Sequence, residues 1–283
     1  MNAIRVEKLN KSFKHFSLKD ITFTVEQGNV VGLVGENGSG KSTIMRCLLN
    51  QDIPSSGTIE LLGQNASTSI DVHNEIGVSY DSCPFPDNFT AKDIDAVLGR
   101  VYKNWNTKRF FSLLEQFHLP LDQKLKEMSR GMKVKVMLST CLSHQARLLL
   151  LDEATAGLDP VVREEILDML LEFMNEEDHS IFMTSHITSD LERIADYILF
   201  IQDGAIVFEE SRENMERYGL ARLTSEQIGF IDPDLVLTIR HQPMNTELLI
   251  KDRAEFRRRY PDYVIEPASI DDVILMLTKG ESL

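Results

Sequence analysis

Short segments in the first two hundred residues alternate apolar and polar positions, and others are unbroken apolar runs. Alternation is typical of half-buried strands, and unbroken runs are typical of strands in the centre of a sheet. The predicted strands cover residues 4–9, 21–25, 30–34, 57–61, 76–80, 148–151, 181–183 and 197–202. Helices are predicted from residue 42 to 50 and after Asp159, which precedes Pro160 at the first helical position. This alternation of elements indicates an α/β fold.

A helical pattern interrupts the strands from about residue 90 to 144. Thr90 and Asn106 fit the preference of helix N-caps for side chains with an accepting oxygen. One helix carries its apolar residues on a single face, namely Phe110, Leu113, Leu114 and Phe117.

The pattern changes again after about residue 218. Strands are predicted there over residues 235–239 and 247–250, and a basic helix over residues 252–260. A last helix begins at Ser269, with Asp272 completing a capping box, and ends at residue 277. We therefore predict a main domain over residues 1–218 and a small C-terminal α+β extension over residues 219–283.

The charge of the chain excludes some classes of partner. The 283 residues include 44 Asp and Glu against 30 Lys and Arg, a net charge of −14. Nucleic-acid binding needs clustered cations, so we expect no nucleic-acid partner, and charge alone would not hold the chain on an anionic membrane. No run is long enough to span a membrane, and the N-terminus has no apolar signal-peptide core. Three widely spaced cysteines fit a reduced, cytoplasmic protein.

One segment after a predicted strand matches the phosphate-binding pattern G-x-x-x-x-G-K-[ST] in full. Its residues are Gly35, Glu36, Asn37, Gly38, Ser39, Gly40, Lys41, Ser42 and Thr43. Glycines let backbone N–H groups approach phosphate oxygens, and the helix that begins near Ser42 points its positive end at the same anion. Lys41 would contact the β- and γ-phosphates, and the Ser42 hydroxyl would bind Mg²⁺.

Acidic residues follow a second buried strand, four leucines long. Asp152 at the carboxyl end of this strand would orient Mg²⁺, and Glu153 could position or deprotonate the attacking water. His186 follows the strand over residues 181–183 and would reach the same sheet edge, where it could contact the γ-phosphate. A histidine is often only structural, but the placement of His186 favours the functional interpretation.

The segment Met128-Ser129-Arg130-Gly131-Met132-Lys133 stands some twenty residues before Asp152 and opens a helix that should run to about residue 144. At this spacing the chain resembles the ATP-binding cassette (ABC) family, whose signature is Leu-Ser-Gly-Gly-Gln. Ser129 and Gly131 match the signature, whereas Met128, Arg130 and Met132 depart from it. The resemblance covers residues 3 to about 210. It implies a P-loop NTPase sheet core of the ABC ATPase type with an inserted helical subdomain over about residues 84–145.

Further positions agree with the family. The residues from Ala156 to Asp159 resemble its D-loop, and His186 matches its switch histidine. Phe13 stands where the family places an aromatic residue that stacks on adenine, although it could instead belong to the core.

Three of the departures from the family pattern bear on the expected chemistry or loop structure. Asp81 occupies the position of the Q-loop glutamine, where it could approach Mg²⁺ or simply act as a hinge of the loop. Ala154 replaces a proline, which should matter little. Arg130 would add a cation beside the transferred phosphate if it points inward.

The resemblance implies the partners. Two chains would sandwich two ATP molecules head to tail, with Ser129, Arg130, Gly131 and Met132 of one chain covering the γ-phosphate bound by the other. A homodimer or a heterodimer is possible. Separate integral-membrane permease subunits would dock near residues 81–89, where Cys83, Pro84, Phe85, Pro86 and Phe89 form either a docking surface or ordinary loop packing.

The function implied is an ATPase that powers transport, with export favoured, from the inner face of the cell membrane. The alternative is a soluble cassette protein that acts on ribosomes or DNA. It is disfavoured by the single cassette, the acidic charge and the lack of sustained heptads.

Overall fold

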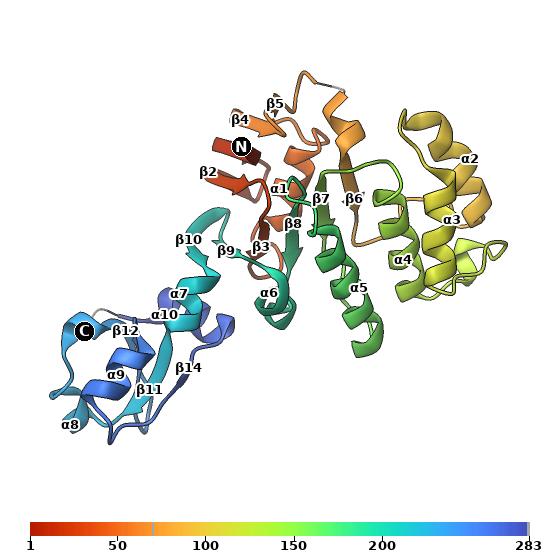
Figure 1. Cartoon of the computed structure of the whole chain (residues 1–283). Helices are drawn as coiled ribbons and strands as arrows, with labels where there is room; N and C mark the ends of the chain where they lie inside the picture. The colour runs from red at the N-terminus through yellow and green to blue at the C-terminus, as the bar shows by residue number, and fades with distance from the viewer. Residues whose placement is uncertain (70, 282–283) are drawn as a thin grey trace. The chain divides into compact units, whose positions relative to one another are not determined.

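A computed structural model describes residues 1–69 and 71–281. The chain divides into two compact units (Figure 1). The first unit holds residues 1–195 with 201–206, and the second holds residues 196–200 with the chain from Val207 onward. The domain boundary expected after residue 218 stays a prediction.

A parallel sheet forms the centre of the first unit. Four neighbouring parallel strands of this sheet, in spatial order, are β3 (Val30–Val34), β8 (Ser180–Ser185), β7 (Leu148–Asp152) and β6 (Ile76–Ser79). Every residue of β3 and β8 is buried, as are the four leucines of β7, which confirms the prediction of buried central strands. The register pairs Val34 with Ser185 and Asp152 with Thr184, so the carboxyl ends of β3, β8 and β7 lie together at one edge.

A second, antiparallel sheet belongs to the same unit. Its spatial order is β2 (Ser17–Glu26), β1 (Asn2–Ser12), β4 (Ser56–Leu61) and β5 (Gln64–Asn65). The apolar residues of β2 alternate inward, and Phe23 stacks on Phe182 of β8 with ring centroids 5.2 Å apart. The alternation therefore provides the contact between the two sheets.

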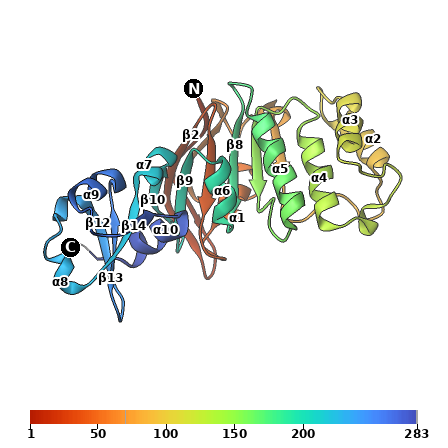
Figure 2. The ribbon, with the colours of Figure 1, turned by 60° about the horizontal axis from the view of Figure 1, so that its bottom comes forward.

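Helices surround the parallel sheet and also form a separate group beyond β6 (Figures 1 and 2). The helices of the unit are α1 (Lys41–Leu48), η1 (Asp71–Glu75), α2 (Ala91–Val101), α3 (Thr107–Gln116), η2 (Leu125–Glu127), α4 (Arg130–Cys141), α5 (Pro160–Phe173) and α6 (Thr188–Ile194). Side chains of Thr90, Asn106 and Asp159 accept N–H groups of α2, α3 and α5, so the predicted N-caps are confirmed.

The group of α2, α3 and α4 has an apolar core of its own. Phe110, Leu113 and Leu114 are buried as predicted, and Phe117 is partly buried at its edge. Cys83, Phe85 and Phe89 are partly buried and pack against the same core, so loop packing accounts for much of this cluster.

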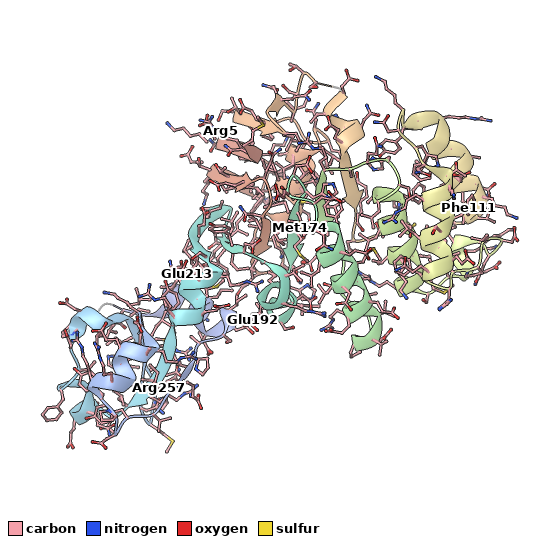
Figure 3. All side chains as sticks on the ribbon, in the orientation of Figure 1. Arg5, Phe111, Met174, Glu192, Glu213 and Arg257 are labelled. Carbon is pink, nitrogen blue, oxygen red and sulfur yellow. The ribbon has the colours of Figure 1, made fainter. Side chains whose placement is uncertain are left out.

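The second unit contains an antiparallel sheet. Its spatial order is β12 (Val236–His241), β13 (Thr246–Ile250), β11 (Gly219–Leu223) and β14 (Ile265–Pro267). Its helices are α7 (Arg212–Arg217), α8 (Ser225–Ile228), η3 (Pro233–Leu235), α9 (Arg253–Arg259) and α10 (Ile270–Lys279). Arg257 extends from α9 and donates to the carbonyl of Ile265 in β14 (Figure 3).

The division between the units crosses the hairpin of β9 (Tyr197–Gln202) and β10 (Ala205–Ser211), whose turn at Asp203-Gly204 lies in the first unit. Among residues 1–69 and 71–281, no helix has both the length and the apolar character that crossing a membrane would require.

Candidate active site

The phosphate-binding motif forms the turn between β3 and α1. A Cβ atom on Gly35 would lie 2.3 Å from the carbonyl oxygen of Ile201, and one on Gly40 would lie 2.7 Å from Leu18. Gly40 also has a φ of 121°, which only glycine adopts readily. No side chain caps α1, so the N–H groups at its start are left to face an external acceptor. The turn therefore fits a phosphate group on steric and on hydrogen-bonding grounds.

Lys41 is held at the centre of this turn. The side chain is 6% exposed, and its ammonium group donates to the carbonyls of Gly35 at 2.7 Å and Glu36 at 3.3 Å. The same ammonium lies 3.6 Å from Glu153 Oε1. A single fixed cation thus stands between the phosphate-binding turn and the predicted base.

Glu153 is oriented from its other side by His186. His186 Nδ1 lies 2.6 Å from Glu153 Oε2, and the backbone N–H of His186 donates to the same oxygen at 3.3 Å. An ionised carboxylate only accepts hydrogen bonds, so Nδ1 carries the proton in this arrangement. The backbone of Glu153 has a φ of 51°, in the left-handed region. Lys41, Glu153 and His186 are brought together as the sequence predicted.

One carboxylate oxygen of Asp152 accepts hydrogen bonds from two hydroxyl groups. Thr184 Oγ1 donates to Asp152 Oδ1 at 2.6 Å, and Ser42 Oγ donates to the same atom at 3.4 Å. In the part of the chain that the structure describes, no cluster of three or more His, Cys, Asp or Glu side chains could hold a metal. The Asp152 carboxylate beside the Ser42 hydroxyl is a donor set that fits Mg²⁺, which binds proteins through one or two carboxylates and completes its shell with water and substrate phosphates.

A pocket of about 660 Å³ opens over the turn. It is lined by His15, Phe16, Asn37, Gly38, Gly40, Lys41, Ser42, Thr43, Asp81, Glu153, Ala156 and His186. Its volume is within the range of small-molecule sites. Asp81 thus lies in the same pocket as Ser42, and its approach to Mg²⁺ stays a prediction. Sequence reasoning missed His15 and Phe16, which come from the loop between β1 and β2, and Thr184, whose only signal was a hydroxyl inside an apolar strand.

Phe13 is close in sequence to His15 and Phe16, which line this pocket. Phe13 itself is 42% exposed. Lys11 Nζ lies over the ring, 5.3 Å from its centroid. The alternative that Phe13 belongs to the core is therefore wrong. Its stacking on adenine stays a prediction.

The predicted signature segment begins α4. Ser129 is exposed and caps the helix by accepting the N–H of Met132 at 3.2 Å, while the Met132 side chain packs against the core of the helical group. Arg130 is exposed and pairs with Asp81 at 2.6 Å. Within the described chain, Arg130 therefore points to a carboxylate of its own chain.

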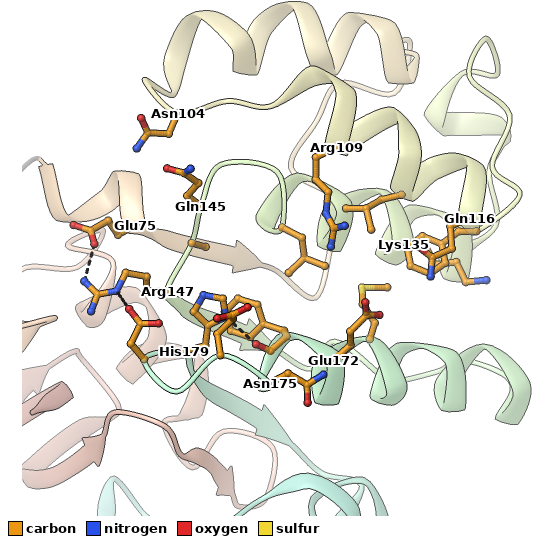
Figure 4. A pocket seen from close by; sticks show the side chains of 18 of the residues that line it. Glu75, Asn104, Arg109, Gln116, Lys135, Gln145, Arg147, Glu172, Asn175 and His179 are labelled. Atoms are coloured by element: carbon orange, nitrogen blue, oxygen red, sulfur yellow. Dashed lines mark hydrogen bonds and ion pairs between the residues drawn. The ribbon is translucent and has the colours of Figure 1, made fainter.

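A larger hollow lies elsewhere, bordered by α3, α4 and α5 (Figure 4). Its volume is about 1150 Å³. Some of its charged side chains pair with one another: Arg147 contacts Glu75 at 3.1 Å and Asp178 at 2.7 Å, and Lys135 contacts Glu165 at 2.5 Å. We place the chemistry at the smaller pocket over the turn, because Lys41, Glu153 and His186 meet there.

The fold and the site define a P-loop ATPase. Residues 18–156 match the family model described as ABC transporter. The chain is 31% identical over 229 residues to the ABC transporter ATP-binding protein YtrB of Bacillus subtilis (strain 168), over 80% of this chain and 75% of that protein. It is 31% identical over 299 residues to the Nod factor export ATP-binding protein I of Rhizobium sp. (strain N33), over 99% of this chain and 98% of that protein.

A solved structure of the ATP binding subunit of an ABC transporter has the same fold, with a TM-score of 0.72 and 21% identity over 98% of this chain and 100% of that one. The chain belongs to the family of ATP-binding proteins of ABC transporters, and it is an ATPase of that family. The predicted family and fold class are confirmed.

We expect Phe13→Ala to weaken ATP binding about fivefold, because loss of one base-stacking aromatic costs about 1 kcal/mol at the lower end of measured values. Equilibrium titration with a fluorescent ATP analogue would measure this. Phe230, which is 76% exposed in the second unit, offers a matched control through Phe230→Ala. An unchanged dissociation constant for Phe13→Ala would exclude the stacking role.

Proposed function

We propose that ATP lies along the phosphate-binding turn with Mg²⁺ beside it, and that Glu153 activates the water that attacks the γ-phosphate. The observation that carries this proposal is the contact of Glu153 with Lys41 on one oxygen and with His186 on the other. Lys41 would bind the phosphates, and Ser42 and Asp152, with Asp81 nearby, would hold Mg²⁺. The metal would neutralise charge on the phosphate oxygens.

In this mechanism Glu153 takes the proton of the attacking water as the water oxygen bonds to the γ-phosphorus. The bond to the β-phosphate oxygen breaks, and ADP leaves. His186 keeps the carboxylate in position through its Nδ1–H and backbone N–H. A base that is already oriented needs less reorganisation in the transition state.

We further propose that two chains complete each other's sites, with the segment from Ser129 to Met132 placed on the γ-phosphate of the partner. The exposure of Ser129 and Arg130 at the start of α4 supports this arrangement. The second chain is a copy of this chain or a related subunit.

The proposed docking site for a permease subunit is a hollow that is lined in part by the loop after β6. About 300 Å³ in volume, it is lined by apolar and aromatic side chains that include Val78, Pro84, Phe85, Leu98 and Tyr102. Tyr102 stacks on His144 there, with ring centroids 4.0 Å apart, and burial lowers the pKa of His144. His144 is therefore neutral at pH 7, and the hollow suits an apolar segment of an integral-membrane subunit.

This partner would place the chain on the cytoplasmic face of the membrane. The proposed direction of transport is export, which is supported by the name of the Rhizobium relative.

The experiment is purification from native membranes through an affinity tag, followed by an assay of Mg²⁺-dependent phosphate release. We expect a multi-spanning membrane protein to copurify, and Pro84→Cys to cross-link to it. Glu115→Cys, on the exposed side of α3, is the control that should not cross-link. A chain that hydrolyses ATP but brings down no integral-membrane partner would exclude the transporter assignment.

A further inference from the structure

Two departures from the family motifs touch each other in the structure. Asp81 stands in place of the Q-loop glutamine, and Arg130 stands in place of a signature glycine. Arg130 Nη2 donates to Asp81 Oδ1 at 2.6 Å, across 49 positions of the sequence. One residue lines the nucleotide pocket, and the other opens α4. Their pairing gives both substitutions a single physical explanation.

Arg130 also lies against the loop that follows Glu153. The place where a Cβ atom of Gly157 would stand is 3.6 Å from Arg130 Nε and 3.9 Å from its Cζ. The guanidinium group therefore sits between the pocket residue Asp81 and the D-loop.

This ion pair is free to exchange partners. The two side chains are 46% and 60% exposed, so water competes for both of them. Exposed pairs contribute little to folding stability. Asp81 also lines the pocket together with Ser42, whose hydroxyl donates a hydrogen bond to Asp152. Carboxylate and hydroxyl oxygens are the ligands that Mg²⁺ prefers.

We propose that Arg130 and Mg²⁺ compete for the Asp81 carboxylate, so that metal binding in the nucleotide pocket releases Arg130 from its own chain. The proposal rests on the proposed function in placing Mg²⁺ in this pocket. Arg130 is a positioning residue here, since it acts on the metal through Asp81. The released guanidinium is then available to an anion presented at the start of α4.

The competition predicts opposite effects for the two residues. Removal of the guanidinium in Arg130→Gln frees the carboxylate, so the half-saturating Mg²⁺ concentration for nucleotide binding should fall about two- to fivefold, the range typical of an exposed ion pair. Asp81→Asn should raise that concentration by about the same factor. The double variant should behave as Asp81→Asn alone, because Arg130 acts only through this carboxylate. Arg130→Lys, which keeps a cation, should stay near the wild type.

The experiment is an equilibrium titration of the full chain with Mg²⁺ at a fixed concentration of trinitrophenyl-ATP, read by fluorescence. Arg5→Gln is the matched control, because Arg5 and Glu7 form a pair of equal length, 2.6 Å, with side chains 49% and 51% exposed. It should not move the Mg²⁺ midpoint. Circular dichroism would verify that each variant is folded.

Three outcomes separate the possibilities. If nucleotide binding by the wild type does not depend on the Mg²⁺ concentration, the metal assignment within the proposed function is overturned. A Mg²⁺-dependent wild type whose midpoint does not fall in Arg130→Gln would overturn the competition alone. A fall in Arg130→Gln that persists in the double variant would also overturn it, because Arg130 would then act on the metal without Asp81.

Discussion

Glu153→Gln should retain ATP binding while its rate of hydrolysis falls by about 10²–10⁴-fold, the contribution typical of general acid–base catalysis. The amide is nearly isosteric with the carboxylate, and it can still accept from His186. It cannot take the proton of the attacking water. Single-turnover phosphate release would measure the rate, and titration with a fluorescent ATP analogue would measure the affinity. The bound complex should then persist as a two-chain assembly in size-exclusion chromatography.

Glu115→Gln provides the matched control for this variant. Glu115 lies on the exposed face of α3, so the same chemical change occurs there outside the pocket. Its rate should equal that of the wild type. Wild-type turnover in Glu153→Gln would show that another group is the base.

Lys41→Ala should weaken nucleotide binding about a hundredfold, because hydrogen bonds to charged groups contribute about 1.5–3 kcal/mol each and this ammonium can make more than one to phosphate. The variant also leaves Glu153 without the cation that lies 3.6 Å from Oε1. Phosphate oxygens would then face an uncompensated carboxylate. Equilibrium titration with ATP would measure the loss.

A folding check belongs with this variant, because Lys41 is 6% exposed and also donates to two backbone carbonyls. Thermal unfolding would show whether the variant is native. Lys108→Ala, on the exposed side of α3, is the control with the same change of side chain. A folded Lys41→Ala protein with wild-type affinity would contradict the assigned role.

The sequence predicted the elements whose signals are local. The leucines of β7 and the N-caps Thr90 and Asn106 are examples, since a buried run or a capping side chain determines its own neighbourhood. The strands β11 and β14 were not predicted. β14 is only three residues long, and its strand character comes from pairing with β11, more than forty positions earlier in the chain.

The same distinction holds at the site. Lys41, Glu153 and His186 could be predicted to meet because each follows a strand of one sheet. The Asp81–Arg130 contact could not, because it depends on how the helical group folds back toward the loop after β6. Phe16 reaches the pocket through the path of a loop, and no hydrophobic period specifies that path. Thr184 was hidden because its role depends on the register of β8 against β7.

The backbone of Glu153 has an implication for protein engineering. A residue other than glycine at a φ of 51° costs about 1–3 kcal/mol, and glycine would relieve most of it. Substitution by glycine would remove this backbone cost and the carboxylate at the same time, and it would also leave the buried Lys41 ammonium without the carboxylate 3.6 Å away. The backbone conformation therefore favours glycine at this position, whereas the contact with Lys41 and the proposed hydrolysis of ATP both favour glutamate. Backbone strain and turnover are thus opposed at a single residue.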